Sequence, residues 1–169
     1  MPFTLFHFGP GATISLLLNR HINVPAFLLA NVVVDFEPFM VMMFSLSYPL
    51  HGYAHSFLGV TALCSIFGYA LYFFRGFITE FMQRFFRRSY SAKRDRMVIS
   101  SLLGGWFHVL LDSMIYYDIR PFYPININPF LGMVDSDLMY RFCAISFIPA
   151  SIFYFGILVI DRYRKRKVS

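Results

Sequence analysis

Long apolar runs separated by short polar stretches dominate this sequence. Three runs are apolar over about 20 positions, the length that a helix needs to cross a bilayer: residues 54–74, 97–117 and 139–160. No internal repeat and no low-complexity linker divides the chain. The pattern predicts one all-α domain over residues 1–169, folded as an integral membrane helical bundle.

Two further apolar segments bring the expected number of membrane-embedded helices to four or five. Residues 24–44 are apolar but contain acidic residues and a proline, so a helix is expected to end near Asp35. Residues 8–18 are apolar over only about half the roughly 20 positions that a span requires. This first segment is therefore predicted to be a short or re-entrant helix.

The amino-acid composition supports a membrane protein. Hydrophobic residues make up 57 % of the chain and charged residues 14 %, well below the quarter that is typical of soluble domains. A single soluble domain of this size has too little interior to bury so much apolar surface. The composition therefore excludes an ordinary soluble domain.

The positive charge is concentrated beside the apolar runs. The net charge is +6, and of the 15 basic residues seven lie between Arg75 and Arg96 and five between Arg162 and Lys167. Such clusters follow the positive-inside rule, so they indicate cytoplasmic segments and not a nucleic-acid partner. The predicted location is a bacterial-type inner (plasma) membrane, crossed several times, with the C-terminus in the cytoplasm.

The segment between the third and fourth runs has the pattern of an amphipathic helix. Large apolar residues recur at helical spacing between Phe77 and Phe86, with Arg84, Arg87 and Arg88 on other faces. This pattern favours a helix that lies on the cytoplasmic surface and contacts anionic lipid headgroups.

On this topology the histidines and acidic residues gather near the outer side of the membrane. Seven of them project to one depth: His7, Asp35, Glu37, His51, His55, His108 and Asp112. The orientation was derived from Lys and Arg alone, so this convergence is an independent observation. Ionisable groups inside a membrane cost several kcal/mol unless they are paired, and this makes them candidates for a functional site.

Two pairs of these residues share a spacing of four. His51 and His55 would lie on one helical face if the helix begins early enough, and His108 and Asp112 repeat the spacing about 6 Å apart along the axis. Histidines and carboxylates without cysteine suit zinc, with manganese or iron as alternatives. Carboxylates that bridge favour two ions, so one or two divalent ions are expected.

Each candidate also has a purely structural explanation. His7 alone fits an interfacial amphipathic side chain, His51 fits a loop residue, and a carboxylate such as Asp35 fits a helix end. His108 and Asp112 fit a buried hydrogen-bonded pair. For His51, a second metal ion, the substrate and the lipid headgroups all remain open as contacts.

Four motifs in order resemble a known family. PFTLFHFGPGA, VVVDFEP, HGYAHSFLG and GGWFHVLLD look like segments of the membrane-bound metal-dependent hydrolases, the LexA-regulated inner-membrane group and its relatives. The resemblance covers the chain from His7 to about Pro129. The order of ligands is also similar to that of zinc-dependent phospholipase C. The resemblance implies a metal site made by His7, Asp35 with Glu37, His55, and His108 with Asp112.

The expected function is a metal-dependent hydrolase that cleaves a phosphoester of a lipid or lipid-linked substrate at the outer leaflet. A metal-bound hydroxide would be the nucleophile, with Asp35 or Glu37 as ligand or general base. Asp118 and Arg120 are expected to contact the substrate, Arg120 as a catalytic bidentate phosphate ligand, although a local Asp118–Arg120 salt bridge is the alternative. A metal-ion or proton transporter, or a scaffold or regulatory protein with a structural metal, is the alternative function.

Overall fold

The described part of the chain is all-helical. The computed structural model describes residues 4–166, and no strand occurs within that range. Residues 1–3, at the start of the N-terminal motif, and Lys167 of the second basic cluster lie outside it. The elements are the 3-10 helix η1 (Thr4–His7), α1 (Phe8–Leu17), α2 (Val24–Val34), α3 (Phe36–Met43), the 3-10 helix η2 (Tyr53–His55), α4 (Phe57–Phe73), α5 (Arg75–Phe86), α6 (Arg94–Ser113), α7 (Ser136–Ile145) and α8 (Phe147–Arg166). The predicted all-α class is confirmed.

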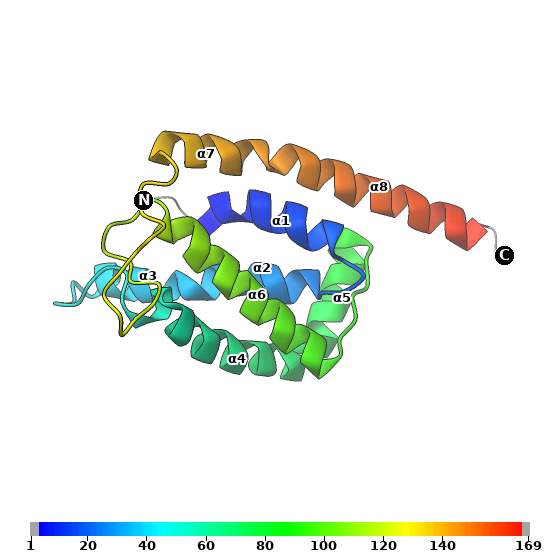
Figure 1. The fold of residues 1–169 in the computed structure, drawn as a ribbon. Helices are drawn as coiled ribbons and strands as arrows, with labels where there is room; N and C mark the ends of the chain where they lie inside the picture. Colours follow the sequence, from blue (N-terminus) through cyan, green and yellow to red (C-terminus); the bar gives the residue numbers. More distant parts are fainter. Residues whose placement is uncertain (1–3, 167–169) are drawn as a thin grey trace.

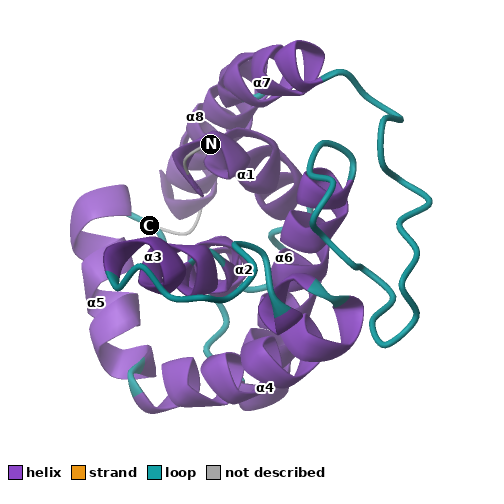
Figure 2. Cartoon of the chain, turned by 90° about the vertical axis from the view of Figure 1, so that its left-hand side faces the viewer, coloured by secondary structure: helices purple, strands orange, loops and turns teal. Residues whose placement is uncertain are grey.

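Helix α6 packs against both α2 and α4, which also contact each other, while α1 packs against α2 and α8 (Figures 1 and 2). Close approach depends on glycine. A Cβ at Gly104 would overlap the carbonyl oxygen of Phe27 in α2, and one at Gly105 would overlap Sγ of Cys64 in α4. Glycines on α6 therefore lie at its contacts with both α2 and α4, and small residues of this kind let membrane helices pack closely.

The apolar run 24–44 is interrupted where its first acidic residue occurs. Helix α2 ends at Val34 with Asp35 as its C-cap, and α3 begins at Phe36. The start of α2 is fixed by Asn23, whose side-chain oxygen accepts the N–H of Ala26 at 2.9 Å. The break predicted near Asp35 is therefore present, and it places a carboxylate at one end of the bundle.

Two helical segments are long and apolar enough to cross a membrane: Val24–Met43, which joins α2 and α3, and Ser136–Tyr163, which joins α7 and α8. A third span results if α4 and α5, bent by 76° at their junction, count as one. Helix α1 is short and apolar, as predicted. The sequence-based expectation of four to five embedded helices included α6, which is not among these candidates. Its buried face carries serines, glycines, a histidine and an aspartate, so it contacts other helices where a span facing lipid would carry apolar side chains.

Helix α5 is set across the end of the bundle opposite the long loops (Figure 1). None of its residues is buried, and Phe77, Phe81 and Phe85 are exposed. The sequence-based prediction of a helix here is confirmed. The basic residues of α5 and of the first turn of α6 lie at the end opposite to His108 and Asp112, which are in the last two turns of α6.

Candidate metal centre

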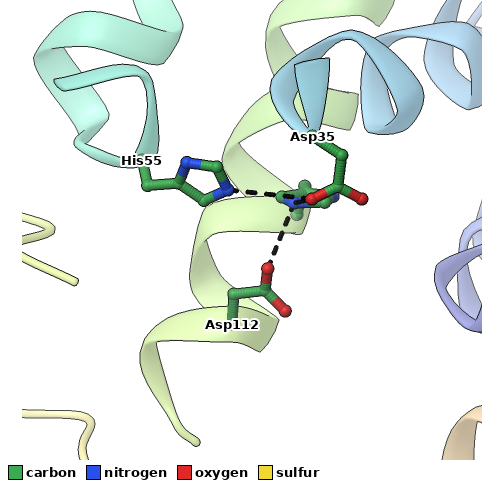
Figure 3. A group of neighbouring side chains, drawn as sticks. Asp35, His55 and Asp112 are labelled. Carbon is green, nitrogen blue, oxygen red and sulfur yellow. Dashed lines mark ion pairs between the residues drawn. The ribbon is translucent and has the colours of Figure 1, made fainter. Parts of the chain in front are cut away.

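Two histidines and two carboxylates from three parts of the chain meet near the C-terminal end of α6. Asp35 lies at the α2–α3 break, His55 ends η2, and His108 and Asp112 lie on α6. One ligand atom from each lies within 4.8 Å of the others. Figure 3 shows Asp35, His55 and Asp112 pointing toward one another from separate ribbons. We call these four residues the His–Asp cluster.

The distances within the His–Asp cluster suit one ion. Nε2 of His108 lies 3.3 Å from Oδ1 of Asp35 and 3.2 Å from Oδ2 of Asp112. Nε2 of His55 lies 3.8 Å from Oδ1 of Asp35. Ligands about 2.1 Å from a tetrahedral ion are about 3.4 Å from one another, so the donor atoms stand near the separation that an ion would impose.

Burial distinguishes this cluster from a set of surface charges. His55 and His108 are fully buried, and Asp112 is 2 % exposed. The Nε2 atoms of both histidines are buried and make no hydrogen bond within residues 4–166, although carboxylate oxygens are close. The His108–Asp112 pair is present, with Nε2 of His108 3.2 Å from Oδ2 of Asp112, but this contact lacks the geometry of a hydrogen bond. Polar atoms left this way in an interior are costly, and a bound cation would satisfy them.

His108 and Asp112 lie on one face of α6, as their spacing of four predicts, because the helix is continuous through both residues. The same reason does not apply to His51 and His55. Helix α4 begins only at Phe57, after Ser56 caps it by accepting the N–H of Gly59 at 2.9 Å. The two rings are nonetheless 4.8 Å apart, because the loop and η2 fold back toward α6. The helix therefore begins too late for His51 and His55 to share a helical face, which was the condition of that expectation, but the two rings are still close.

Glu37 lies behind His55 and does not belong to the His–Asp cluster. Its Oε2 is 3.1 Å from Nδ1 of His55 and accepts the N–H of Gly52 at 3.0 Å. Its Oε1 accepts the N–H of Ala54 at 3.2 Å and lies 3.4 Å from the hydroxyl of Tyr48. Both oxygens are therefore engaged by the loop. In these contacts Glu37 supports His55, and the role of ligand or general base expected from the sequence stays a prediction.

This support follows a pattern that is common around protein metal sites. A histidine ligand usually donates its second ring N–H to a carboxylate, which fixes the ring and its tautomer. With Nδ1 of His55 held by Glu37, Nε2 is the nitrogen that faces Asp35. The same carboxylate also holds the loop that carries His55. Glu37 therefore fixes both the ring of the histidine and the backbone to which it is attached.

His7 stands beside the His–Asp cluster. It is 2 % exposed, and its Nε2 lies 3.0 Å from Oδ1 of Asp112. Its ring centroid is 4.5 Å from that of His108. His7 is therefore not a solitary histidine at the membrane interface, because its ring is buried inside the bundle at the end of η1.

His51 is paired with Asp118 across the loops. Nδ1 of His51 lies 2.9 Å from both carboxylate oxygens of Asp118, and the backbone N–H of His51 donates to the same group at 3.3 Å. Burial and the nearby His55 lower the pKa of His51, although Asp118 acts in the opposite direction. Asp118 therefore pairs with His51, where the sequence left a salt bridge to Arg120 open.

A cleft of about 520 Å³, lined by both polar and apolar side chains, opens beside His51. The segment 48–53 and the segment 117–131 line it, and its walls include Asp118, the exposed Arg120 and several tyrosines. Since His51 lines this cleft and its ring is 4.8 Å from that of His55, the cleft lies next to the His–Asp cluster. Asp118 and Arg120, the two expected substrate contacts, both line this cleft.

Two residues near the site, the buried Asn31 and the half-buried Tyr116, were not among the residues expected from the sequence. Asn31 lies one turn before Asp35, is fully buried, and has a side-chain oxygen with no hydrogen-bond partner among the described residues. The four-residue spacing from Asp35 within an apolar helix was a usable signal. The ring of Tyr116 lies 4.5 Å from that of His51, and no sequence pattern distinguished it from the other tyrosines.

The donor set therefore fits a divalent metal ion, with two imidazole nitrogens and two carboxylates converging in a buried space. These donors do not fix which metal it is. Comparison with protein-family models, with curated proteins and with solved structures finds no match for this chain. The resemblance to membrane-bound hydrolases therefore stays a prediction from the sequence.

Proposed function

We propose that this chain is an integral membrane hydrolase that uses one or two divalent ions to cleave a phosphoester in a lipid or lipid-linked substrate. The observation that carries the proposal is a buried His–Asp cluster near a cleft that is lined by Arg120 and by His51, the neighbour of His55. A structural metal needs no adjacent cleft, whereas a hydrolytic one needs room for substrate next to the ion.

Asp35, His55, His108 and Asp112 are the proposed ligands, and zinc is the proposed metal. A divalent ion in such a site activates water and polarises a phosphoryl oxygen. His7, within 3.0 Å of Asp112, orients that ligand or joins a second ion. In this proposal Glu37 holds His55 in position and takes no part in proton transfer, because its oxygens are already engaged.

The cleft supplies the proposed contacts to substrate. Arg120 is exposed on its wall, and a guanidinium binds phosphate through two parallel hydrogen bonds. Asp118 holds the ring of His51 at Nδ1, which fixes the orientation of Nε2. His51 therefore presents one nitrogen in a set direction between the cleft and His55.

The proposed topology has four to five membrane-embedded helices, with the His–Asp cluster near the outer leaflet and α5 on the cytoplasmic surface. The basic residues of α5 and of the start of α6 lie at the end of the bundle opposite to the cluster, which supports this arrangement. The positive-inside rule then places the cluster outside. A lipid headgroup of the outer leaflet is the substrate within reach.

A transporter is the alternative, and the interior gives it less support. Between the cluster and the α5 end, Nδ2 of Asn31 donates to the carbonyl of Phe27 and the hydroxyl of Ser100 donates to that of Arg96, so Oδ1 of Asn31 is the oxygen of these two side chains that has no partner within residues 4–166. Groups engaged in this way stabilise helices and are not free to pass an ion along. A scaffold with a structural metal stays as the third option.

Metal content provides the first test. The protein is purified in detergent, stripped with a chelator, reloaded with zinc, manganese or iron, and analysed by mass spectrometry of the elements. Stoichiometric metal is expected in the wild type and in His21→Ala, an exposed histidine away from the site, and its loss is expected in Asp112→Ala. Equal metal in all three proteins, or none in any, would contradict the proposed site.

Activity separates the three functions. The metal-loaded protein is incubated in micelles with a panel of lipid phosphates and diphosphates, and released phosphate is measured. Release that is lost in His55→Ala supports the hydrolase. Metal uptake into proteoliposomes without phosphate release supports the transporter, and bound metal with neither activity supports the scaffold.

A further inference from the structure

An apolar groove lies between α1, α2, α5 and α8, at the end of the bundle away from the metal site. Its volume is about 590 Å³, within the range of small-molecule sites. The first turns of α2 line it, whereas the His–Asp cluster lies beyond the last residue of α2. The groove is therefore a separate feature that the proposed hydrolysis does not use.

Small side chains create the space inside the groove. Along α1 the lining residues are Phe8, Ala12 and Leu16, which share one helical face, and α8 contributes Ala150 and Ser151. Leu16 and Ala150 also belong to a packed core cluster. The floor is therefore a fixed part of the fold, and the hollow exists because alanine and serine stand where larger residues would fill it.

The groove opens toward the surface that a bilayer would cover. Phe77 and Phe81 of α5 line it and are 71 % and 43 % exposed. Two of its walls, α2 and α8, belong to the segments long and apolar enough to span a membrane. A lipid acyl chain is the apolar ligand that such an opening meets, and each buried CH₂ contributes about 0.8 kcal/mol.

Positive charge lies at the α5 end of the groove. Arg88 stands over the ring of Tyr90, a lining residue, with its guanidinium carbon 5.6 Å from the ring centre. Arg88 itself is held by Asp161 and Asn19. Arg84 and Arg87, on either side of the lining residue Phe86, are exposed, and neither forms an ion pair with another described residue.

From the apolar groove and the arginines at its end, we propose that the groove binds one acyl chain of an anionic phospholipid, with the lipid phosphate at Arg84 and Arg87. The chain fills the space beside Ala12 and Ser151, and the headgroup stays at the membrane surface near α5. This lipid site is independent of the metal, so it is expected in the metal-free protein.

Photolabelling tests this site. Metal-stripped protein is placed in phosphatidylcholine nanodiscs that contain a small fraction of phosphatidylglycerol with a diazirine in its acyl chain, and labelled peptides are identified by mass spectrometry. Label is expected on the groove faces of α1 and α8. Removing one arginine with Arg84→Gln or Arg87→Gln is expected to lower this labelling about fivefold, the effect of one basic residue near an anionic surface.

Filling the groove provides the matched comparison. Ser151→Phe places a ring in the groove from an exposed position, whereas Ile152→Phe changes a neighbour that is 65 % exposed and does not line it. Groove labelling is expected to fall in the first variant and to persist in the second. Equal labelling by diazirine phosphatidylcholine, or no effect of Ser151→Phe, would each overturn the proposal.

Discussion

Glu37 holds His55, with Oε2 of the carboxylate 3.1 Å from Nδ1 of the imidazole. The same carboxylate accepts two backbone N–H groups of the loop that carries the histidine, those of Gly52 and Ala54. This one side chain therefore sets both the path of the loop and the direction of the ring. The nitrogen left facing the other cluster residues is Nε2.

Replacing Glu37 is expected to weaken metal binding without abolishing it. A carboxylate that supports a histidine ligand is worth about 10- to 100-fold in metal affinity. Glu37→Gln keeps the side-chain shape but removes the charge, and the affinity can be measured by competition with a zinc chelator of known strength. Glu80→Gln, an exposed glutamate on α5, is the control. A loss as complete as that in Asp112→Ala would instead make Glu37 a direct ligand.

Bound metal is expected to stabilise the folded protein. An ion that binds only the native state at about 100 times its Kd adds about 2.7 kcal/mol, which raises the unfolding midpoint by several degrees. The midpoint is measured in detergent with chelator and with added zinc. Asp112→Ala is expected to show no shift, whereas Asp137→Ala, an exposed aspartate, should respond like the wild type. A shift that survives in Asp112→Ala would place the ion elsewhere.

Acidification is expected to destabilise the metal-free protein through His51. Burial and the neighbouring His55 lower the pKa of His51 below its usual value of 6.5. The unfolded chain therefore takes up this proton first, and the stability present above 6.5 is lost as the pH falls from 6.5 toward the folded pKa. Unfolding midpoints at about pH 7.5 and about pH 5.5 should differ less in His51→Gln than in the wild type. An identical difference in both proteins would exclude this residue as a cause.

Substituting Gly104 is expected to separate α6 from α2. A Cβ there overlaps a backbone oxygen, which cannot turn aside as a side chain can, so Gly104→Ala should destabilise the protein by about 1–3 kcal/mol. Gly156 on α8 has nothing within 4 Å of its added Cβ, so Gly156→Ala should be neutral or stabilise by about 0.5–1 kcal/mol. Unfolding curves of the two variants make the comparison. Equal stability would mean that the helices can move apart at little cost.

If the proposed hydrolysis is correct, Arg120 acts on substrate and not on metal. Arg120→Gln is expected to lower kcat/KM by about 10- to 100-fold, because hydrogen bonds to a charged group are worth about 1.5–3 kcal/mol. Zinc content should stay unchanged in this variant. Arg141→Gln, another exposed arginine outside the cleft, serves as the control. Loss of zinc together with activity would assign Arg120 to the structure of the site.

The sequence indicated which residues would come together, but not all of the reasons why they do. His108 and Asp112 could be paired from spacing because a continuous helix joins them. His51 and His55 were paired by the same rule, yet the helix begins after them at Phe57 and a loop brings the rings together. The role of Glu37 could not be inferred, because its contact with His55 joins two segments of the chain and two of its other partners are backbone N–H groups, which any sequence supplies.

The amino-acid sequence by itself determined the helical class, the break at Asp35, the exposed apolar face of α5 and the glycines that let α6 pack. These features depend on local chemistry: runs of apolar residues, a carboxylate within such a run, helical spacing, and the absence of a side chain. The tertiary structure alone decided which of the seven candidate residues bring their ligand atoms close enough to bind one ion. It also decided that Asp118 pairs with His51 and that Glu37 supports His55. Those outcomes depend on how loops 44–56 and 114–135 fold against the end of α6, and contacts between distant segments leave no periodic trace in the sequence.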